Sequence, residues 1–284
     1  MTDSTSTALP GKPLAIITGA GGGMGQACAR RLANTHALIL TDYNEQRLEA
    51  IASTLQDEEN AEIAATVAGD ITSDEVIGRI IRAAGSSGRC KVLVHTAGLS
   101  PALAGWESIV RTNLVGTAKL LNAVENVLSP GFVGVVLSST ARLFVPRPGA
   151  ELAEILAAPL AADLIDRIGR HLGDADEDRA ANAYAYTKAW TCNAAMQLAT
   201  GWAESGARIV SISPGFIRTG MTKIEVVQRP EMLTLLETTP LKRWGTVGDI
   251  ANVVDFILSD KASFITGADF VIDGGLSARI LNNS

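Results

Sequence analysis

The stretch Leu14-Ala-Ile-Ile-Thr-Gly-Ala-Gly-Gly-Gly-Met-Gly25 decides the fold. Its first five residues form a short apolar run typical of a buried strand, and helix-forming residues continue from Met24 to Ala33. Glycines between a strand and a helix let the backbone approach a pyrophosphate, which the helix N-terminus attracts through its free N–H groups. The alternative is a flexible turn, but the strand–turn–helix context favours a phosphate site. The residues expected to form this site are Gly19, Gly23, Met24 and Gly25.

Strands and helices alternate along the rest of the chain. Further strands are predicted at 37–41, 63–68, 91–96, 132–138, 207–213 and 269–273. Helices are predicted between them, at 44–55, 73–84, 106–128, 184–204 and 247–258. Continuous apolar strands separated by helices predict a single α/β Rossmann-type domain with a doubly wound, seven-stranded parallel sheet. This domain is assigned to residues 14–284, and residues 1–13 are expected to form a flexible N-terminus.

The composition excludes several classes of protein. The chain has 284 residues, with 24 Lys and Arg against 30 Asp and Glu, and its net charge of −6 argues against nucleic-acid binding and against docking on anionic membranes. No signal peptide or apolar run of spanning length is recognised. Cys28, Cys90 and Cys192 have neither metal-binding nor disulfide spacing, which favours a reducing cytoplasm. No metal site is predicted.

Asp42 is predicted to complete the nucleotide site. It ends the second strand, where a carboxylate can accept hydrogen bonds from both hydroxyls of an adenosine ribose and would repel a 2′-phosphate. Tyr43 follows it, rather than Arg or Lys. The pattern therefore favours NAD as the cofactor over NADP. The alternative is a solvated turn residue or a helix N-cap.

Tyr184 and Lys188 are the catalytic candidates. They are four residues apart in a helical stretch and therefore share one helix face. A free tyrosine has a pKa near ~10, which is too high for an efficient base at neutral pH. A nearby ammonium and a nicotinamide cation would favour the phenolate. The alternative is a half-buried tyrosine beside a surface lysine.

The combination resembles the short-chain dehydrogenases/reductases. The resemblance rests on Thr-Gly-x-x-x-Gly-x-Gly at 18–25, on Asp42 and on Tyr-x-x-x-Lys at 184–188, and it extends from about residue 14 to residue 275. It implies that Ser139 binds the substrate oxygen and that Asn113 holds a water that relays protons to the lysine. The alternatives are a strand-end hydroxyl for the serine, and a helix kink or buried polar bond for the asparagine.

The resemblance also implies further cofactor contacts. Asp70 and Ile71 would hold the edge of the adenine, although Asp70 could instead cap a helix. Thr96-Ala-Gly matches the Asn-Ala-Gly of the family, and the threonine puts one structural hydrogen bond in doubt. The loop 214–219 would seat the nicotinamide. The alternative is a plain Pro-Gly turn. These contacts are Asp70, Ile71, Ala97, Gly98, Pro214, Ile217 and Thr219.

A long segment separates the candidate serine from the candidate tyrosine. Most of the family has roughly a dozen residues there, an ordinary loop length. Apolar residues at helical spacing predict one or two amphipathic helices within 145–182, broken near Pro159, with the acidic run 174–178 leading back to Tyr184. The segment would either form the rim of the substrate pocket or cover a surface otherwise used in oligomerisation. Such an insertion resembles the 3α-hydroxysteroid dehydrogenase/carbonyl reductase branch and favours a bulky, apolar secondary alcohol, such as a hydroxysteroid or an aryl alcohol, and its ketone.

A second variable segment, 220–240, is rich in apolar residues. The resemblance implies a lid over the substrate, whereas ordinary helix packing or a dimer contact would look alike in sequence. It also implies a homodimer or homotetramer. An NAD-using epimerase or lyase and a non-catalytic NAD-binding regulator are the other function classes. The presence of the serine, tyrosine and lysine together favours the NAD-dependent dehydrogenase or reductase.

Overall fold

Seven parallel strands form one sheet, as predicted, and their order is β3-β2-β1-β4-β5-β6-β7. The computed structural model describes residues 11–85, 88–228 and 231–282, so most of the predicted flexible N-terminus lies outside the described residues. The strands are β1 (Leu14–Thr18), β2 (Ala37–Asp42), β3 (Ile63–Ala68), β4 (Cys90–His95), β5 (Val133–Leu137), β6 (Arg208–Pro214) and β7 (Asp269–Ile272).

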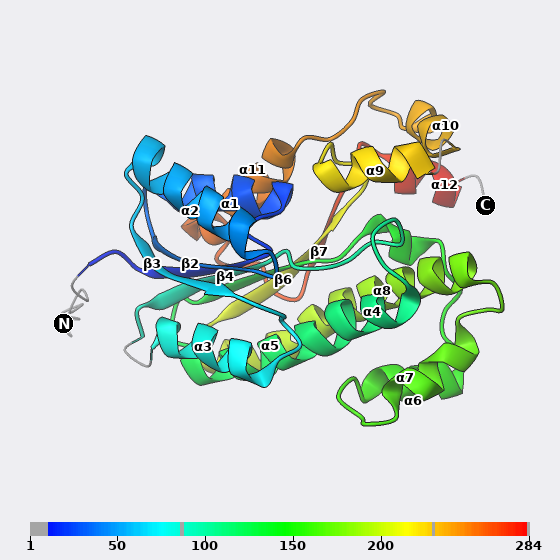
Figure 1. Cartoon of the computed structure of the whole chain (residues 1–284), viewed down its shortest axis with the longest axis horizontal. Coiled ribbons are helices and arrows are strands. Elements are labelled where there is room, and N and C mark those ends of the chain that lie inside the picture. The colour runs from blue at the N-terminus through cyan, green and yellow to red at the C-terminus, as the bar shows by residue number, and fades with distance from the viewer. Residues whose placement is uncertain (1–10, 86–87, 229–230, 283–284) are drawn as a thin grey trace.

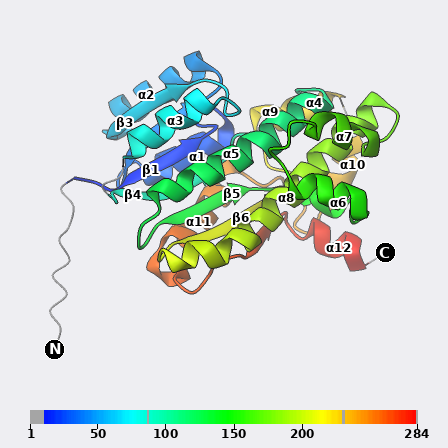
Figure 2. The same ribbon diagram turned by 90° about the horizontal axis from the view of Figure 1, so that it is seen from below.

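Helices cover both faces of this sheet (Figures 1 and 2). The helices α1, α2 and α11 lie on one face, and α3, α5 and α8 lie on the other (Figure 1). None of the helices in the described ranges is long and apolar enough to cross a bilayer. Their bounds are α1 (Gly23–Leu32), α2 (Glu45–Glu59), α3 (Asp74–Ala84), α4 (Trp106–Val110), α5 (Thr117–Val124), α6 (Ala150–Ala157), α7 (Leu164–Ile168), α8 (Asp176–Glu204), α9 (Gly220–Gln228), α10 (Glu231–Thr238), α11 (Val247–Leu258) and α12 (Leu276–Asn282).

The central strands are largely apolar because they contribute to two cores. Side chains alternate across a strand, so Ile17 packs under α1 and α11 while Ile16 packs on the opposite face. Leu40 and Ile39 divide between the same two cores in β2. A parallel sheet covered on both faces requires this pattern, which explains why the strands could be recognised from sequence.

The predicted helix over 106–128 is interrupted. A π-helical turn, Arg111–Gly116, separates α4 from α5. Asn113 lies within this turn, and its Nδ2 donates to the Leu99 carbonyl at 2.9 Å while its Oδ1 accepts from the Leu99 N–H at 2.8 Å. These two bonds hold the asparagine to the loop after β4, and a π turn accommodates the extra residue in the helix.

The helix α8 begins eight residues before the predicted start at Tyr184. The acidic residues 176–178 form its first turn, where the helix dipole stabilises negative charge, so most of the acidic run is helical rather than a connection. Two side chains of this extension hold the preceding segment. The Arg179 guanidinium lies 4.5 Å from the ring centroid of Trp106 and donates to the Gly169 carbonyl at 3.2 Å, and Asn182 donates to the Leu172 carbonyl at 2.9 Å.

The segment between β5 and α8 contains two short helices, α6 and α7. Their apolar side chains form a third core together with residues of α4, the π turn and α8. Figure 2 shows α6 and α7 beside α8. The buried members of this core include Leu152, Ile155, Leu164, Ile168, Ile109, Leu114 and Tyr186. The segment therefore covers part of the α4 and α8 surface.

Candidate active site

The turn after β1 is shaped for close approach of a ligand. Gly19 has a φ of +67°, and a Cβ there would lie 2.8 Å from the Ala97 nitrogen. A Cβ on Gly25 would collide with the Gly19 carbonyl oxygen. Helix α1 starts at Gly23, and among the described residues no side chain caps its N-terminus and no acidic residue occupies its first turn. Its backbone N–H groups are therefore available to an anion, which fits the pyrophosphate of a dinucleotide.

Asp42 lies against this turn. Its Oδ2 accepts from the Gly21 N–H at 2.9 Å, and its Oδ1 accepts from the Asn44 N–H at 2.9 Å. Asn44, rather than Asp42, caps α2, because its side chain accepts from the Arg47 N–H. Arg47 is a neighbour that the sequence analysis missed: its Cβ lies 2.9 Å from the point that a Cβ on Gly21 would occupy.

Asp70 and Ile71 follow β3. Asp70 is exposed, and its Oδ1 accepts from the Thr72 N–H at 2.8 Å, so its carboxylate closes a turn. Ser73 provides the side-chain cap of α3. Ile71 is buried against Gly116, where a Cβ would lie 2.7 Å from the Ile71 Cγ2. Both residues lie at the carboxyl end of the sheet.

Thr96, which stands where the family has asparagine, makes a structural hydrogen bond with β1. Its hydroxyl donates to the Thr18 carbonyl at 2.8 Å, and the Ala97 N–H donates to the Thr18 hydroxyl at 3.3 Å. His95 is a buried strand residue, as predicted. Its ring nitrogens lie 2.6 Å and 2.9 Å from the hydroxyls of Thr18 and Thr117, and burial lowers its pKa to about 3. Nowhere in the described ranges are three His, Cys, Asp or Glu side chains grouped to hold a metal.

Tyr184, Lys188, Asn113 and Gly98 meet beyond β4 and β5. The Lys188 Nζ lies 5.8 Å from the Tyr184 ring centroid. A Cβ on Gly98 would lie 3.2 Å from the Asn113 Oδ1 and 3.4 Å from the Lys188 Nζ, so Gly98 separates these two side chains. Lys188 is buried, its Nζ donates to the Leu137 carbonyl at 2.8 Å, and burial lowers its pKa to about 8.

The two serines after β5 have different partners. The Ser138 hydroxyl donates to the Lys188 carbonyl at 2.7 Å and fastens β5 to α8. The Ser139 hydroxyl accepts from the Ala141 N–H at 3.2 Å, which begins the 3₁₀ turn Thr140–Leu143. Because Ser139 uses an acceptor site in this bond, its O–H can still donate to a ligand.

The loop after β6 lies beside the glycine turn. Ile217 is buried, and the Thr222 N–H donates to the Thr219 hydroxyl at 3.2 Å. A Cβ on Gly23 would lie 3.4 Å from the Thr219 Cγ2. The residues predicted for the two ends of a dinucleotide therefore lie together at the carboxyl ends of the strands. They extend from Asp42 to the loop at Pro214.

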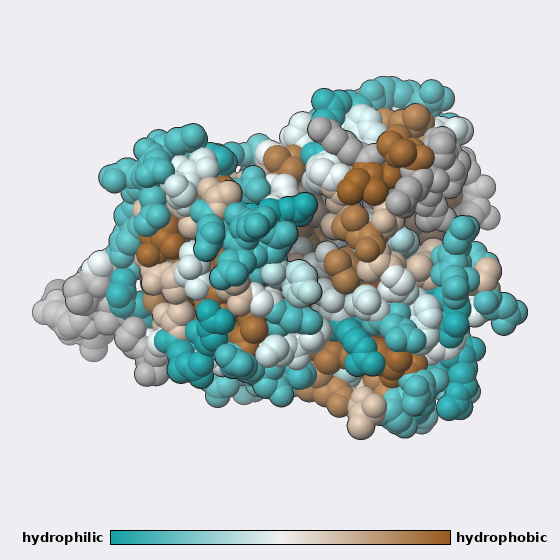
Figure 3. Space-filling view, viewed as in Figure 1, coloured by the Kyte–Doolittle hydropathy of each residue, from teal (hydrophilic) through white to brown (hydrophobic). Residues whose placement is uncertain are grey.

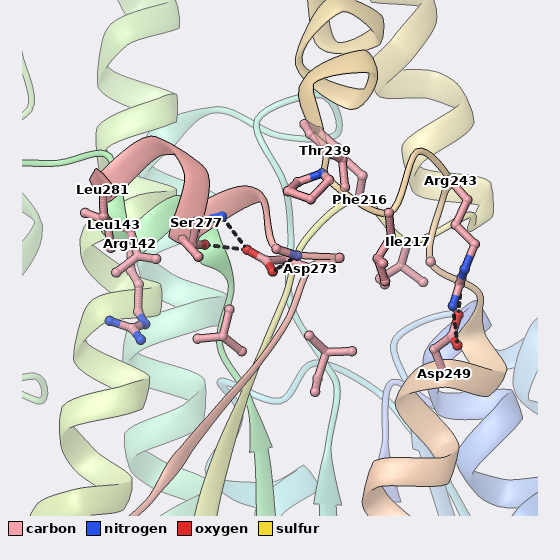
Figure 4. A pocket seen from close by; sticks show the side chains of 18 residues that line it. Arg142, Leu143, Phe216, Ile217, Thr239, Arg243, Asp249, Asp273, Ser277 and Leu281 are labelled. Atoms are coloured by element: carbon pink, nitrogen blue, oxygen red, sulfur yellow. Dashed lines mark hydrogen bonds and ion pairs between the residues drawn. The ribbon is translucent and has the colours of Figure 1, made fainter. Parts of the chain in front are cut away.

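A cavity of about 900 Å³ adjoins this loop. Figure 4 shows Arg142 and Leu143 on one side of it, and Arg243 with its partner Asp249 on the other. Tyr184 is not among its lining residues, so the cavity lies beside the candidate catalytic tyrosine rather than over it. Arg142, which no sequence signal singled out, belongs to the turn that follows Ser139.

Helices α9 and α10 occupy the predicted lid segment. Figure 3 shows a hollow on this face of the molecule, with hydrophobic residues over α9. Ile224, Val227 and Leu233 are exposed there, which matches the apolar character of the segment. Residues 229 and 230 of the predicted lid lie outside the described residues.

Two family profiles match the sequence. The one described as short chain dehydrogenase matches residues 13–148, and the one described as enoyl-(acyl carrier protein) reductase matches residues 176–277. A short-chain dehydrogenase/reductase of Alternaria brassicicola is 30% identical over 93% of this chain and 96% of its own. The galactitol 2-dehydrogenase (L-tagatose-forming) of Cereibacter sphaeroides is 28% identical over 92% and 93%.

Solved structures share the architecture. Levodione reductase superposes with a TM-score of 0.72 at 25% identity, over 94% of this chain and 98% of its own. The 3-alpha-hydroxysteroid dehydrogenase from Pseudomonas sp. B-0831, complexed with NADH, superposes with a TM-score of 0.75 over 95% and 99%. At 24% identity, this second likeness concerns the fold alone.

Proposed function

Because the chain belongs to the short-chain dehydrogenase/reductase family, we propose that this oxidoreductase interconverts a secondary alcohol and its ketone with NAD(H). The observation that carries the proposal is the meeting of Tyr184, Lys188 and Asn113 around Gly98. They meet outside the carboxyl ends of the strands, where open α/β sheets bind ligands. The chemistry depends on how these side chains handle a proton and orient an oxygen.

Tyr184 is the acid and base of the proposed reaction. In oxidation its phenolate takes the proton of the substrate hydroxyl, and in reduction its hydroxyl returns a proton to the carbonyl oxygen. Ser139 donates a hydrogen bond to the same oxygen and fixes its direction. The buried ammonium of Lys188 stabilises the phenolate, since an unscreened positive charge near the ring favours the anion.

Asn113 supports proton delivery to Lys188. Both polar atoms of its side chain bind the Leu99 backbone, so the amide cannot turn freely. Its Oδ1 lies near the Lys188 Nζ across Gly98 and keeps a second lone pair for a water. We infer that the asparagine holds one end of a water path while it shapes the π turn.

We propose NAD as the cofactor, with NADP disfavoured. The pyrophosphate fits the uncapped N-terminus of α1, and Asp42 faces the turn where an adenosine ribose would lie. Asp70, Ile71, Ala97 and Gly98 would border the adenine and ribose, while Pro214, Ile217 and Thr219 would hold the carboxamide. When bound, the nicotinamide ring supplies the hydride acceptor or donor.

The proposed substrate is a bulky, apolar secondary alcohol or its ketone. The exposed apolar side chains of α9 and α10 support this proposal, because apolar groups line most small-molecule sites. Relatives act on diverse alcohols: one is named for galactitol and another for cis-4-hydroxycyclohexanecarboxylate. The first assay therefore uses a panel of hydroxysteroids, aryl alcohols, cyclic hydroxy acids and sugar alcohols.

NADH formation from NAD and this panel tests the proposal. We expect turnover by the unmodified protein and loss of at least ~10³-fold in Tyr184→Phe, since the proton acceptor is removed. Tyr186→Phe is the matched control, because Tyr186 is buried in the core beside α6 and α7 and should leave the rate intact. Tight NADH binding without turnover of any alcohol or ketone would instead favour a regulator, and absence of NADH binding would refute the cofactor assignment.

We also propose a homodimer or homotetramer in the cytoplasm. Free cysteines, two of them buried, are compatible with a reducing compartment. Because the segment with α6 and α7 covers part of α4 and α8, an oligomer must use the remaining surface of those helices or another face. Light scattering after size-exclusion chromatography measures the mass, and a monomer at micromolar concentration would contradict the proposal.

A further inference from the structure

Arg142 joins the turn after Ser139 to the last two strands. It is the third residue of that 3₁₀ turn, and its side chain reaches Ser213 near the end of β6 and Asp269 at the start of β7. Its Nη2 donates to the Asp269 Oδ2 at 2.6 Å, and its Nε donates to the Ser213 hydroxyl at 3.1 Å. The two bonds use the planar fork of the guanidinium, which a lysine cannot reproduce.

The partners of Arg142 are themselves fixed. Asp269 also accepts from the Ser211 hydroxyl at 2.6 Å and from the Ser213 hydroxyl at 2.9 Å. The side chains of Arg142 and Asp269 are only 21% and 12% exposed. A largely buried, hydrogen-bonded ion pair resists displacement, because moving either charge leaves the other without compensation.

This network meets each segment that carries the proposed chemistry. Ser213 directly precedes Pro214, where the nicotinamide loop begins, and Thr140 donates to the Pro214 carbonyl at 3.2 Å. Ser138, which directly precedes Ser139, donates to the Lys188 carbonyl on α8 at 2.7 Å. The turn after Ser139 is therefore tied to the start of the nicotinamide loop through Arg142 and Thr140, and to the helix of Tyr184 and Lys188 through the neighbouring Ser138.

We propose that Arg142 is a positioning residue that sets Ser139 relative to the nicotinamide loop. This inference rests on the proposed function, because the distance it fixes is that between the substrate oxygen and the hydride site. Reactions of this kind depend on alignment, and a displacement of about 1 Å can cost ~10²-fold in rate. In this role Arg142 transfers no proton and acts through the turn that follows Ser139.

Arg142→Met tests the inference, with Arg208→Met as the matched control. Arg208 lies at the opposite end of β6 and donates to the Ile265 and Ile257 carbonyls, each at 2.9 Å. We expect Arg142→Met to lower kcat by about 30- to 100-fold while the Kd of NADH changes by less than about threefold. Arg142→Lys should recover part of kcat because it restores the charge without the fork. Arg208→Met should lower Tm comparably and keep kcat.

Hydrogen exchange gives a readout that needs no substrate. We expect residues 139–145 and 214–219 to exchange faster in Arg142→Met, and these segments to stay protected in Arg208→Met. Unchanged protection overturns the inference, even if no substrate is turned over. Faster exchange with an unchanged kcat also overturns it. A wild-type protein without turnover refutes the proposed function alone, since the exchange experiment still decides whether Arg142 holds the two segments.

Discussion

Asn in place of Asp42 should change the cofactor preference. The carboxylate accepts from the Gly21 and Asn44 N–H groups, and so it lies where an adenosine ribose would meet the glycine turn. Asparagine keeps the size of the side chain and removes its charge. Its carbonyl can still accept one of the two N–H groups, so the loss of folding stability should be about 1 kcal/mol.

The magnitude follows from the charge on a 2′-phosphate. Two unit charges about 5 Å apart repel by roughly 3 kcal/mol at an effective dielectric constant of about 20, and a phosphate carries about 1.5 to 2 charges. Solvent screening reduces this repulsion between Asp42 and the phosphate. A repulsion of about 3 kcal/mol is a conservative value, and it weakens NADP binding by roughly 10²-fold. Asparagine also loses charge-assisted bonds to the ribose of NAD, about 1 kcal/mol. The NADP-to-NAD ratio of kcat/KM should therefore rise by about 10² to 10³.

Arg47 provides the second half of this experiment. Its Cβ lies beside the Cβ position of Gly21, and we expect its exposed cation to attract a 2′-phosphate more strongly once Asp42 is neutral. Asp42→Asn combined with Arg47→Gln should lose about tenfold of the gained NADP activity. Glu45→Gln is the control, because it removes a negative charge like that of Asp42 from a neighbouring position. Initial rates with both cofactors measure the ratio, and a change below about threefold in Asp42→Asn, or an unmodified protein that prefers NADP, would refute the reasoning.

Three further results are expected. Gly25→Ala should destabilise the fold by more than about 3 kcal/mol, because the new Cβ meets the Gly19 carbonyl oxygen. Gly201→Ala, at an exposed position on α8, should instead raise Tm by about 2 °C, and a similar Tm for both variants would contradict this prediction. NADH binding at pH 8.5 should be accompanied by proton uptake, because Lys188 has a pKa of about 8 in the free protein and the anionic cofactor raises this pKa. Calorimetry in two buffers of different ionisation enthalpy measures the uptake. Proton uptake that persists in Lys188→Met would have to come from another group. Arg179→Met should lower Tm by a few degrees by releasing the segment with α6 and α7 from α4, and an unchanged Tm would show that this contact holds nothing.

Local patterns were enough to predict the sheet and most helices. The glycine turn, the apolar strands and the Tyr184–Lys188 spacing each depend on neighbours within a few residues, and the strand order follows the rules of right-handed parallel connections. The early start of α8 was missed because acidic residues suit a solvated connection and a first helical turn equally well. Asn113 was recognised as unusual in a helix, but its π turn depends on bonds to Leu99 from another loop.

The remaining parts of the site depend on contacts between distant residues. Arg142 and Asp269 are 127 positions apart, and nothing near either one indicates the other. Arg47 reads as an exposed helical residue until the chain folds it beside Gly21. Pairs of this kind emerge only from the tertiary arrangement, so a search of the sequence for short motifs does not find them.

The position of β1 has a consequence for synthesis of the chain. β1 lies between β2 and β4, so one of its edges is unpaired until residues 90–95 leave the ribosome. During that interval the nascent chain presents an apolar strand edge open to pairing with other polypeptides. The edge closes once β4 has been synthesised, and a pause in translation before β4 would prolong the exposure. A strand in the interior of the mature sheet is thus an exposed apolar edge in the half-made protein.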